Sequence, residues 1–205
     1  MIKFGLPKKE STKRAGFTMV EVVVMLSIIT ILSIIVLFNF TGLNEGGALA
    51  RSTRELALAL RQAQNMALAV NQVQAGVSPS PLVNKIPPAV GIKLIRGTSN
   101  YQIFADFNPR NDIYSGSSES IGNALVFERK ISISSLFYYD AFGRKPISAV
   151  NIIFTAPEAA ISIRDVNGED KGDKLEIELT APTTGSCKKL VIITSGQISI
   201  KSCQN

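Results

Sequence analysis

Residues 17–40 form an apolar run of 24 residues in which Glu21 is the only charged side chain. A helix of that length is about 36 Å long, which exceeds the roughly 30 Å thickness of the hydrocarbon core of a bilayer. The run is also longer than the ~7–15 apolar residues of a secretory signal peptide. It therefore predicts a membrane-spanning helix. A carboxylate at the centre of a bilayer costs about 2.5–3.5 kcal/mol, so Glu21 requires an explanation.

The segment before this run carries most of the net charge of the chain. Residues 1–16 contain five basic residues and one acidic residue, and the whole chain has a net charge of +6. Basic residues that precede an apolar helix keep that end of the helix in the cytoplasm. We therefore expect a single-pass protein with a cytoplasmic N-terminus and its remaining residues outside. Because the excess charge lies in this leader, we do not expect nucleic acid as a partner.

Three ways of processing this N-terminus are open. The first is a signal peptide cleaved after Ala48-Leu49-Ala50, which fits the small-x-small pattern but not the length of the apolar run. The second is an uncleaved signal-anchor, in which Glu21 gains stability from the dipole at the start of the helix. The third is cleavage after Gly16, a small residue that lets a peptidase approach the backbone. This third cleavage leaves Phe17 as the N-terminus and Glu21 as the fifth residue.

The stretch KRAGFTMVEVVVMLSIITIL resembles the class III signal of type IV pilins and type II secretion pseudopilins. The matching features are the short basic leader, the glycine at the cut, the phenylalanine after it, the glutamate at the fifth mature position and the apolar helix. The resemblance implies that a prepilin peptidase cleaves after Gly16 and methylates the new amine of Phe17. It also implies that Glu21 directs filament assembly. A buried carboxylate is tolerable when paired, and the amine of Phe17 in a neighbouring subunit can supply the pair.

The next two segments are expected to be a joint and a second helix. Residues 41–47 contain three glycines, each of which weakens a helix by about 1 kcal/mol relative to alanine, so we expect a melted or kinked joint. Residues 48–74 have the pattern of an amphipathic helix that packs on a sheet. Its apolar stripe consists of Leu56, Leu60, Ala63, Ala67 and Val70, and its polar surface includes Arg51, Arg54, Arg61 and Asn65.

Residues 75–205 are expected to form an extracytoplasmic domain rich in β-strands. It begins with a Pro-, Gly- and Ser-containing loop at residues 75–88, after which apolar and polar side chains alternate with a period of two. The candidate strands are Val90–Arg96, Tyr101–Asn108, Ala124–Leu136, Val150–Thr155, Ala160–Asp165, Lys174–Thr180, Lys189–Ile193 and Gln197–Ser202. Many short strands separated by turns favour a small antiparallel sandwich or twisted sheets packed on the helix. The chain as a whole is therefore expected to be α+β, with a long N-terminal membrane-spanning helix followed by a β-sandwich-like domain.

A second resemblance covers parts of this domain. The segments RELALALRQAQNMALAVNQ, AVGIKLI, YQIFADFNPRND and LVIITSGQISIKSC are similar to H-type minor pseudopilins and their pilus counterparts. In that family one long helix is followed by a β-sandwich that ends in a hairpin. The chain departs from the pattern because it lacks the aromatic-rich, Trp-bearing strand that is common there.

Cys187 and Cys203 flank the last predicted hairpin, and Ser195 is the midpoint between them. A turn through residues 194–196 would set the two cysteines opposite each other, at a Cα separation of about 4.5–5.5 Å that a disulfide can bridge. The location outside the membrane is oxidising, so we expect a disulfide. The alternative is a turn at Gly196-Gln197, which would shift the register and leave two free buried thiols.

The sequence offers few groups for chemistry, and we expect no enzymatic activity. It has no His, which removes the usual proton shuttle and the commonest metal ligand. Two acidic loops share features with calcium sites, but neither has the full pattern of an EF-type loop, so polar turns without a cofactor are the default. The loops contain Asp106, Asn108 and Asp112, and Asp165, Asn167, Glu169, Asp170 and Asp173; calcium is the alternative, chiefly at the second loop. A cluster of Lys188, Lys189 and Lys201 on the last hairpin is expected to be solvated rather than bound to DNA.

These features together predict a minor pilin or pseudopilin subunit of a type II secretion pseudopilus or a type IV pilus. The expected partners are other pilin or pseudopilin subunits, the prepilin peptidase, the assembly platform of the inner membrane and membrane lipid. The β-rich domain is expected in the periplasm or outside the cell, within the filament. The alternative is a signal-anchored binding module that acts in DNA uptake or adhesion without polymerising.

Overall fold

The structure is a computed structural model that describes residues 16–69, 73–75, 82–107 and 110–203, with the side chains of residues 38–43, 73–75 and 82–85 left out of the description. The chain divides into two compact units, Met1–Thr41 and Gly42–Asn205. The predicted leader, apart from Gly16, lies outside the described residues, as do Val70 and Asn108.

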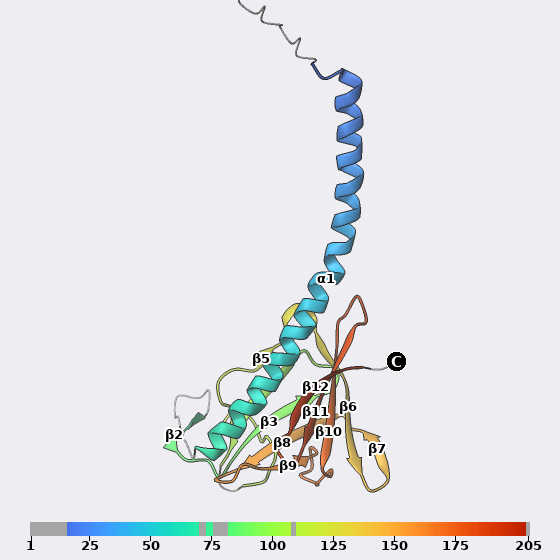
Figure 1. Ribbon diagram of the computed structural model, residues 1–205. Coiled ribbons are helices and arrows are strands. Elements are labelled where there is room, and N and C mark those ends of the chain that lie inside the picture. Colours follow the sequence, from blue (N-terminus) through green and yellow to red (C-terminus); the bar gives the residue numbers. More distant parts are fainter. Residues whose placement is uncertain (1–15, 70–72, 76–81, 108–109, 204–205) are drawn as a thin grey trace, which may run out of the picture. The chain divides into compact units, whose positions relative to one another are not determined.

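One helix, α1 (Met19–Leu68, 50 residues), contains both helical segments that the sequence predicts (Figure 1). Residues 41–47 are helical, so the expected melting of the joint does not occur. Three glycines weaken the helix by about 3 kcal/mol in total. That cost is offset because the helix is already nucleated on both sides and because Ala48 and Leu49, directly after the glycines, are buried. The helix ends at Leu68, before the expected residue 74.

In the first unit, Met19–Leu37 has a mean hydropathy of 2.8, and none of it is buried. This 19-residue stretch is long and apolar enough to cross a membrane. The apolar side chains that it exposes would be costly in water, because each buried aliphatic side chain is worth about 1.5–3 kcal/mol.

The second unit contains two antiparallel five-stranded sheets and a two-stranded ribbon. The first sheet has the order β5 (Leu125–Val126), β4 (Asn100–Asp106), β3 (Ala89–Ile95), β8 (Ala149–Thr155) and β9 (Ala160–Arg164). The second sheet has the order β12 (Ile198–Ser202), β11 (Cys187–Ile193), β10 (Lys174–Thr180), β6 (Ser132–Asp140) and β7 (Gly143–Pro146). The ribbon pairs β1 (Val73–Ala75) with β2 (Leu82–Lys85), and a short 3-10 helix, η1, covers Glu128–Lys130. The α+β class is therefore confirmed.

Period-two patterning explains most of these strands. In β10, the alternate residues Leu175, Ile177 and Leu179 are fully buried, as the alternation predicts. The expected strand at residues 124–136 is wrong, because the chain there forms β5, η1 and the start of β6. The backbone of Arg129 (φ 48°) and Lys130 (φ 59°) is left-handed, which no continuous strand allows.

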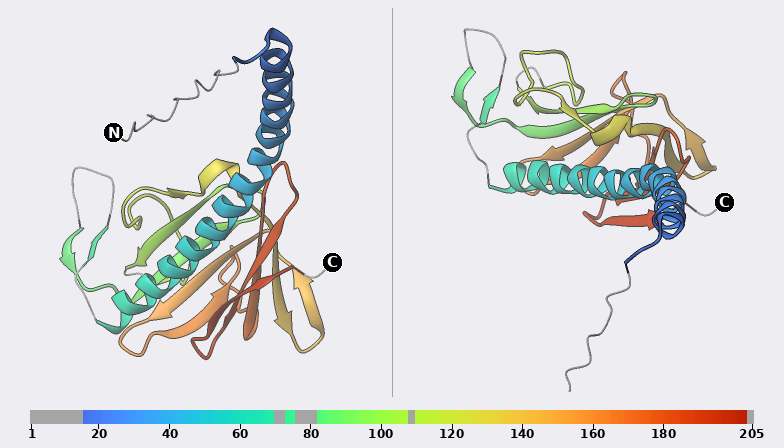
Figure 2. Two further views of the ribbon diagram at one scale, coloured as in Figure 1. Left: turned by 45° about the horizontal axis from the view of Figure 1, so that its top comes forward. Right: turned by 90° about the horizontal axis from the view of Figure 1, so that it is seen from above.

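Both sheets and the C-terminal half of α1 share one hydrophobic core, and Figure 2 shows this half of the helix lying against the strands. The predicted helical stripe is confirmed where it is described, because Leu56, Leu60 and Ala63 are 0% exposed and Ala67 is 1% exposed. The strands contribute mainly Val, Ile and Leu side chains to the same cluster. Its largest fully buried members include Leu94, Ile131, Ile133, Leu136, Ile152 and Phe154.

Candidate functional site

The start of α1 is built around a side-chain cap. The backbone N–H of Glu21 donates a hydrogen bond to Oγ1 of Thr18 at 3.3 Å, in the Thr-x-x-Glu pattern of a capping box. An acid in the first turn is also stabilised by the helix dipole, typically by about 0.3–1 kcal/mol. Gly16 and Phe17 precede the helix in an exposed, non-helical segment, with Phe17 74% exposed. The predicted cleavage position is therefore accessible in this structure.

Polar side chains further along the apolar helix are satisfied within it. The hydroxyl groups of Ser27, Thr30 and Ser33 donate to backbone carbonyls four residues earlier, at 2.9, 2.7 and 2.7 Å. Such internal bonds are what a helix in lipid requires, because no water is available there. The carboxylate of Glu21 differs, since it has no ion pair or hydrogen-bond donor among the described residues. A partner for this charge has to come from outside these residues.

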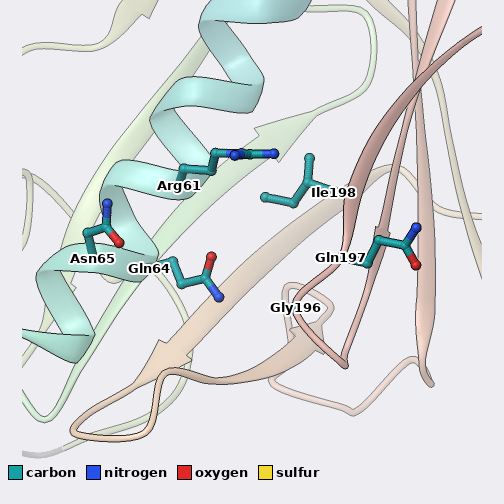
Figure 3. Close-up of a pocket in the computed structure, with 6 residues that line it drawn as sticks. All are labelled: Arg61, Gln64, Asn65, Gly196, Gln197 and Ile198. Atoms are coloured by element: carbon teal, nitrogen blue, oxygen red, sulfur yellow. The ribbon is translucent and has the colours of Figure 1, made fainter.

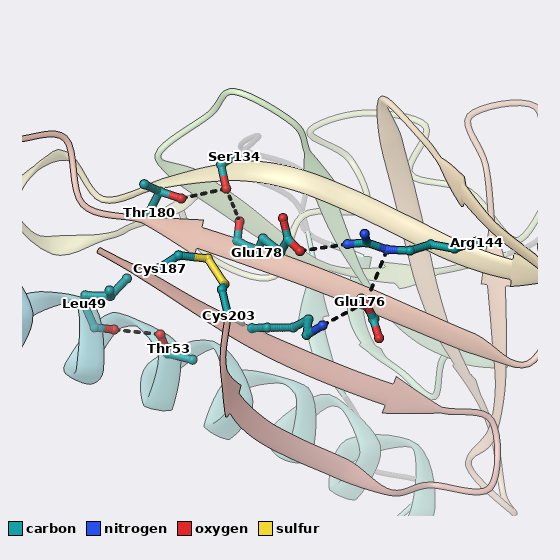
Figure 4. Close-up of a disulfide and its surroundings, with 10 residues drawn as sticks. Leu49, Thr53, Ser134, Arg144, Glu176, Glu178, Thr180, Cys187 and Cys203 are labelled. Atoms are coloured by element: carbon teal, nitrogen blue, oxygen red, sulfur yellow. Dashed lines mark hydrogen bonds and ion pairs between the residues drawn. A yellow bond between two sulfur atoms is a disulfide. The ribbon is translucent and has the colours of Figure 1, made fainter. Parts of the chain in front are cut away.

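The predicted disulfide between Cys187 and Cys203 is present, with a Cα–Cα distance of 5.6 Å (Figure 4). Strands β11 and β12 pair in the predicted register, in which Lys188 faces Ser202 and Ile192 faces Ile198. The turn is closed by the backbone N–H of Ile193, which donates to the carbonyl of Gln197 at 3.0 Å. The hairpin therefore turns through residues 194–196, and the alternative register is wrong.

A buried acid lies on the same face of the sheet as the disulfide. Glu176 on β10 is 4% exposed and pairs with Lys174 at 3.0 Å, Lys189 at 3.3 Å and Arg144 at 3.5 Å. Burial acts to raise the pKa of Glu176, but hydrogen bonds led by that from Lys174 outweigh it and hold the pKa below its usual value. Figure 4 shows Arg144 reaching both Glu176 and Glu178.

The expected lysine cluster on the last hairpin does not form. Lys189 is bound to Glu176. Lys188 lies next to it in β11, so its side chain points to the opposite face of the sheet. Only Lys189 and Lys201, which face each other across the strand pair, share a face. The charge available to an anionic polymer is smaller than the sequence suggests.

The two acidic loops lie side by side, and their carboxylates bind donors of this chain. Asp106 is fully buried and accepts backbone N–H groups of Asp112 at 2.8 Å and Asn111 at 3.4 Å. Burial is the main reason that the pKa of Asp106 is raised. Arg164 connects the loops through Asp112 at 3.7 Å and Asp170 at 3.6 Å.

In the second loop, the carboxylate of Asp165 accepts the backbone N–H groups of Asn167 at 2.8 Å and Glu169 at 3.0 Å, and it pairs with Lys171 at 3.0 Å. Burial would raise the pKa of Asp165, but these donors, led by Lys171, hold it below its usual value. Within the described parts of the chain, no three His, Cys, Asp or Glu side chains gather in a way that could hold a metal ion.

Two features of the second unit were not anticipated from the sequence. Glu45 is 5% exposed and accepts the backbone N–H of Thr184 at 2.9 Å, which ties α1 to the loop between β10 and β11. A second contact of the same kind between α1 and the rest of the unit is the ion pair between Arg51 and Glu128 at 2.7 Å.

The other unanticipated feature is a polar cleft of about 360 Å³ between α1 and the β11–β12 turn (Figure 3). It is lined by Arg61, Gln64, Asn65, Gly196, Gln197 and Ile198.

We compared the chain with protein-family models, with curated proteins and with solved structures, and none of the three comparisons gave a match.

Proposed function

We propose that the chain is a non-enzymatic minor pilin or pseudopilin subunit. In this proposal a prepilin peptidase processes it after Gly16, and it then enters a type II secretion pseudopilus or a type IV pilus. One observation carries the proposal. An accessible Gly16-Phe17 boundary precedes an apolar helix whose first turn holds a single carboxylate, that of Glu21, which has no partner among the described residues.

The helix Met19–Leu37 supports a single crossing of the inner membrane, because it is long and apolar enough. The basic leader supports a cytoplasmic N-terminus, with the β-rich domain in the periplasm or outside the cell. The disulfide between Cys187 and Cys203 fits such an oxidising compartment. The shared core of the two sheets supports a sandwich-like domain.

Glu21 would have two roles in such a subunit. Within one chain its backbone N–H donates to Thr18, a cap contact that glutamine or alanine at this position keeps. Between chains its carboxylate would pair with the cationic amine of Phe17 in a neighbouring subunit, a role that requires the negative charge. A subunit added in the wrong axial register would leave a buried charge unpaired, which typically costs about 3–5 kcal/mol.

Intact-mass spectrometry of the membrane fraction tests the processing step. The expected mature protein begins at N-methylated Phe17. A Gly16→Val variant should retain its leader, because the larger side chain hinders the approach of the peptidase. A wild-type protein that keeps its leader, or one that begins at Arg51, would contradict this proposal.

Substitution of Glu21 tests the assembly step and separates its two roles. Glu21→Gln should insert and be processed normally but form no filaments, since it keeps the cap and loses the charge; Glu21→Ala should behave in the same way. Thr18→Ala is the matched control, because it weakens the cap and keeps the carboxylate, so filaments should still form. Normal filaments from Glu21→Gln would overturn the pairing role. Processed wild-type protein that never polymerises would favour the anchored binding module.

A further inference from the structure

Strand β12 is the free edge of the second sheet, and its unpaired backbone groups can be assigned. The hydrogen bond from Ile193 N–H to the carbonyl of Gln197 identifies this pair as a hydrogen-bonded pair of the antiparallel ladder. Because such pairs alternate with non-hydrogen-bonded pairs, Ser199 and Lys201 point their backbone groups toward β11. Ile198, Ile200 and Ser202 therefore point theirs outward, away from the sheet.

The edge strands β7 and β9 are blunted, whereas the described part of β12 carries only the charged side chain of Lys201 as such a device. Strand β7 carries Pro146 and has only four residues. The edge of β9 is covered by the loop that follows it, since the backbone N–H of Lys171 donates to the carbonyl of Ile163 at 2.9 Å. Natural proteins usually protect edges by such devices. Among the described residues of β12 there is no proline, and its pairing with β11 shows no bulge.

Both ends of β12 are held in place. At one end the β11–β12 turn packs against α1, where a Cβ on Gly196 would lie 3.3 Å from Nε2 of Gln64. At the other end the disulfide joins Cys203 to β11. A strand fixed at both ends presents its outward N–H and C=O groups in a constant geometry. This lowers the ordering cost of a partner that pairs with them.

Helix α1 forms a wall beside the start of this edge. In Figure 3 the side chains of Arg61 and Gln64 extend from α1 toward the turn and Ile198, across the cleft of about 360 Å³. A second hollow of about 610 Å³ continues over the exposed face of the helix and shares Arg61 and Asn65 with the cleft. Its lining includes Leu58, which is 64% exposed. A sheet edge beside a helix is the arrangement in which extended peptides dock by strand addition.

The charges around this edge are positive and available. Arg61 in the cleft and Lys201 on β12 have no ion pair or hydrogen bond within the described part of the chain. Their side chains also lie on different sides of the edge, since Lys201 faces the outer surface of the sheet with Lys189. An added strand that carries carboxylates would thus meet a cation on each face.

We propose that β12 and α1 form a docking groove for an extended acidic segment of a partner polypeptide, which adds to the second sheet as a further strand. Backbone groups of Ile198, Ile200 and Ser202 would supply the pairing, and Arg61 would select for acidic side chains. This docking is a further activity and does not depend on filament assembly.

The test uses the full chain in detergent and a labelled, end-capped peptide of sequence EVEVTVE as the probe. Fluorescence anisotropy measures binding, and amide hydrogen exchange locates it. The bound probe should slow exchange at Ile200 and Ser202, whose N–H groups are free, while Ser199 and Lys201 should change little because they already pair with β11. A probe of sequence KVKVTVK should bind more weakly by about tenfold or more, since it cannot form charge-assisted hydrogen bonds with Arg61 or Lys201.

Three variants sharpen the test. Ile200→Pro removes an outward N–H without removing a bond to β11, so it should fold and lose probe binding by more than tenfold. Ile200→Thr keeps the N–H and should bind within about threefold of wild type, because strand addition rests on backbone pairing. Arg61→Gln should abolish most of the preference for the acidic probe over the basic one. Thermal melts check the fold of each variant, and Lys201→Pro is the contrasting variant, because it removes a ladder bond and should destabilise β12.

Several results would overturn the proposal. One is equal binding by Ile200→Pro and wild type, and another is exchange protection that does not follow the alternation along β12. Binding of a single-stranded oligonucleotide in place of the acidic peptide, with loss in Arg61→Gln, would identify a surface for anionic polymers instead of a strand-addition groove. No measurable binding of the acidic probe by the folded wild-type chain would also overturn it.

Discussion

The disulfide between Cys187 and Cys203 should contribute about 3 kcal/mol to the free energy of unfolding of the second unit. The bridge spans a sequence separation of 16 residues. In the chain-entropy description, closing a loop of that length lowers the conformational entropy of the unfolded chain, which raises its free energy by about 3 kcal/mol. For a domain of this size, 1 kcal/mol corresponds to about 2–4 °C in Tm. Replacing both cysteines by serine should therefore lower Tm by about 6–12 °C.

Replacing both cysteines should lower the local stability of β12 as well as the global stability of the second unit. Among the described strands, β11 is the only ladder neighbour of β12, and the disulfide holds the end at which the chain leaves the sheet. Without the bridge, β12 should fray from Ser202 and carry the partly buried Ile198 out of the core. Amide exchange at Ser199 and Lys201 should accelerate by more than the global change, whereas amides in the middle of β10 should follow the global change.

The assay is denaturant and thermal unfolding of a fragment that starts at Gly42, where the second unit begins. A fragment that starts at residue 48 would lose the contact between Glu45 and Thr184. Reductant should destabilise the wild-type fragment to the level of the double-serine variant and leave that variant unchanged. Equal Tm values for the wild-type fragment and its double-serine variant without reductant would refute the reasoning. Free, reactive thiols in the protein taken from its native compartment would also refute it.

Four further predictions concern the same fragment. Gly91→Ala should destabilise it by about 1–3 kcal/mol in denaturant unfolding, because the Cβ would lie 2.5 Å from a ring carbon of a core phenylalanine. Gly46→Ala should instead stabilise it by about 1 kcal/mol, because this exposed helical position has no atom within 4 Å of the new Cβ. Burial raises the pKa of Tyr101 to about 12, so its contribution to stability is complete below pH ~10 and is lost as the pH rises toward 12. Tyr101→Phe should remove this alkaline loss in unfolding measurements made from pH 9 to pH 11.5. A hydrogen bond from Thr183 is the largest cause of the lowered pKa of Glu45. The stability that Glu45 gives is therefore present above pH ~4.5 and lost as the pH falls through its folded pKa, and Glu45→Gln should flatten that acid loss.

The strands that could be predicted from the sequence are those whose alternation is regular and whose ends carry turn residues. The predicted bounds of β10 match the observed ones, and the strands at 149–155 and 198–202 differ from prediction by one residue at their start. The strand at 89–95 is shifted by one residue at both ends. The register of the last hairpin was also predictable, because two cysteines equidistant from a turn leave few pairings. Local pattern and turn chemistry were sufficient in these places.

The elements that could not be predicted depend on contacts between distant residues or on backbone geometry that the residue type does not reveal. Residues 41–47 have low helix propensity, yet packing of the following turns keeps them helical. In the sequence Glu45 belongs to the glycine-rich segment 41–47, and its partner Thr184 is 139 residues away in the chain. Arg129 and Lys130 adopt left-handed backbone conformations that are uncommon for such residues, so the break between β5 and β6 has no signature in the sequence.

The acidic loops show why carboxylate spacing alone is a weak guide to a metal site. A buried carboxylate needs donors or a positive charge, and calcium is one source of charge. In the second loop the chain supplies both the positive charge and the donors. Lys171 pairs with one carboxylate oxygen of Asp165 at 3.0 Å, and two backbone N–H groups donate to the other oxygen of the same carboxylate. Arg164 performs the corresponding task between the loops, through Asp112 and Asp170. The basic residues near an acidic turn must therefore be counted as possible partners of its carboxylates before a bound cation is inferred. Each of the two loops here carries at least one basic residue.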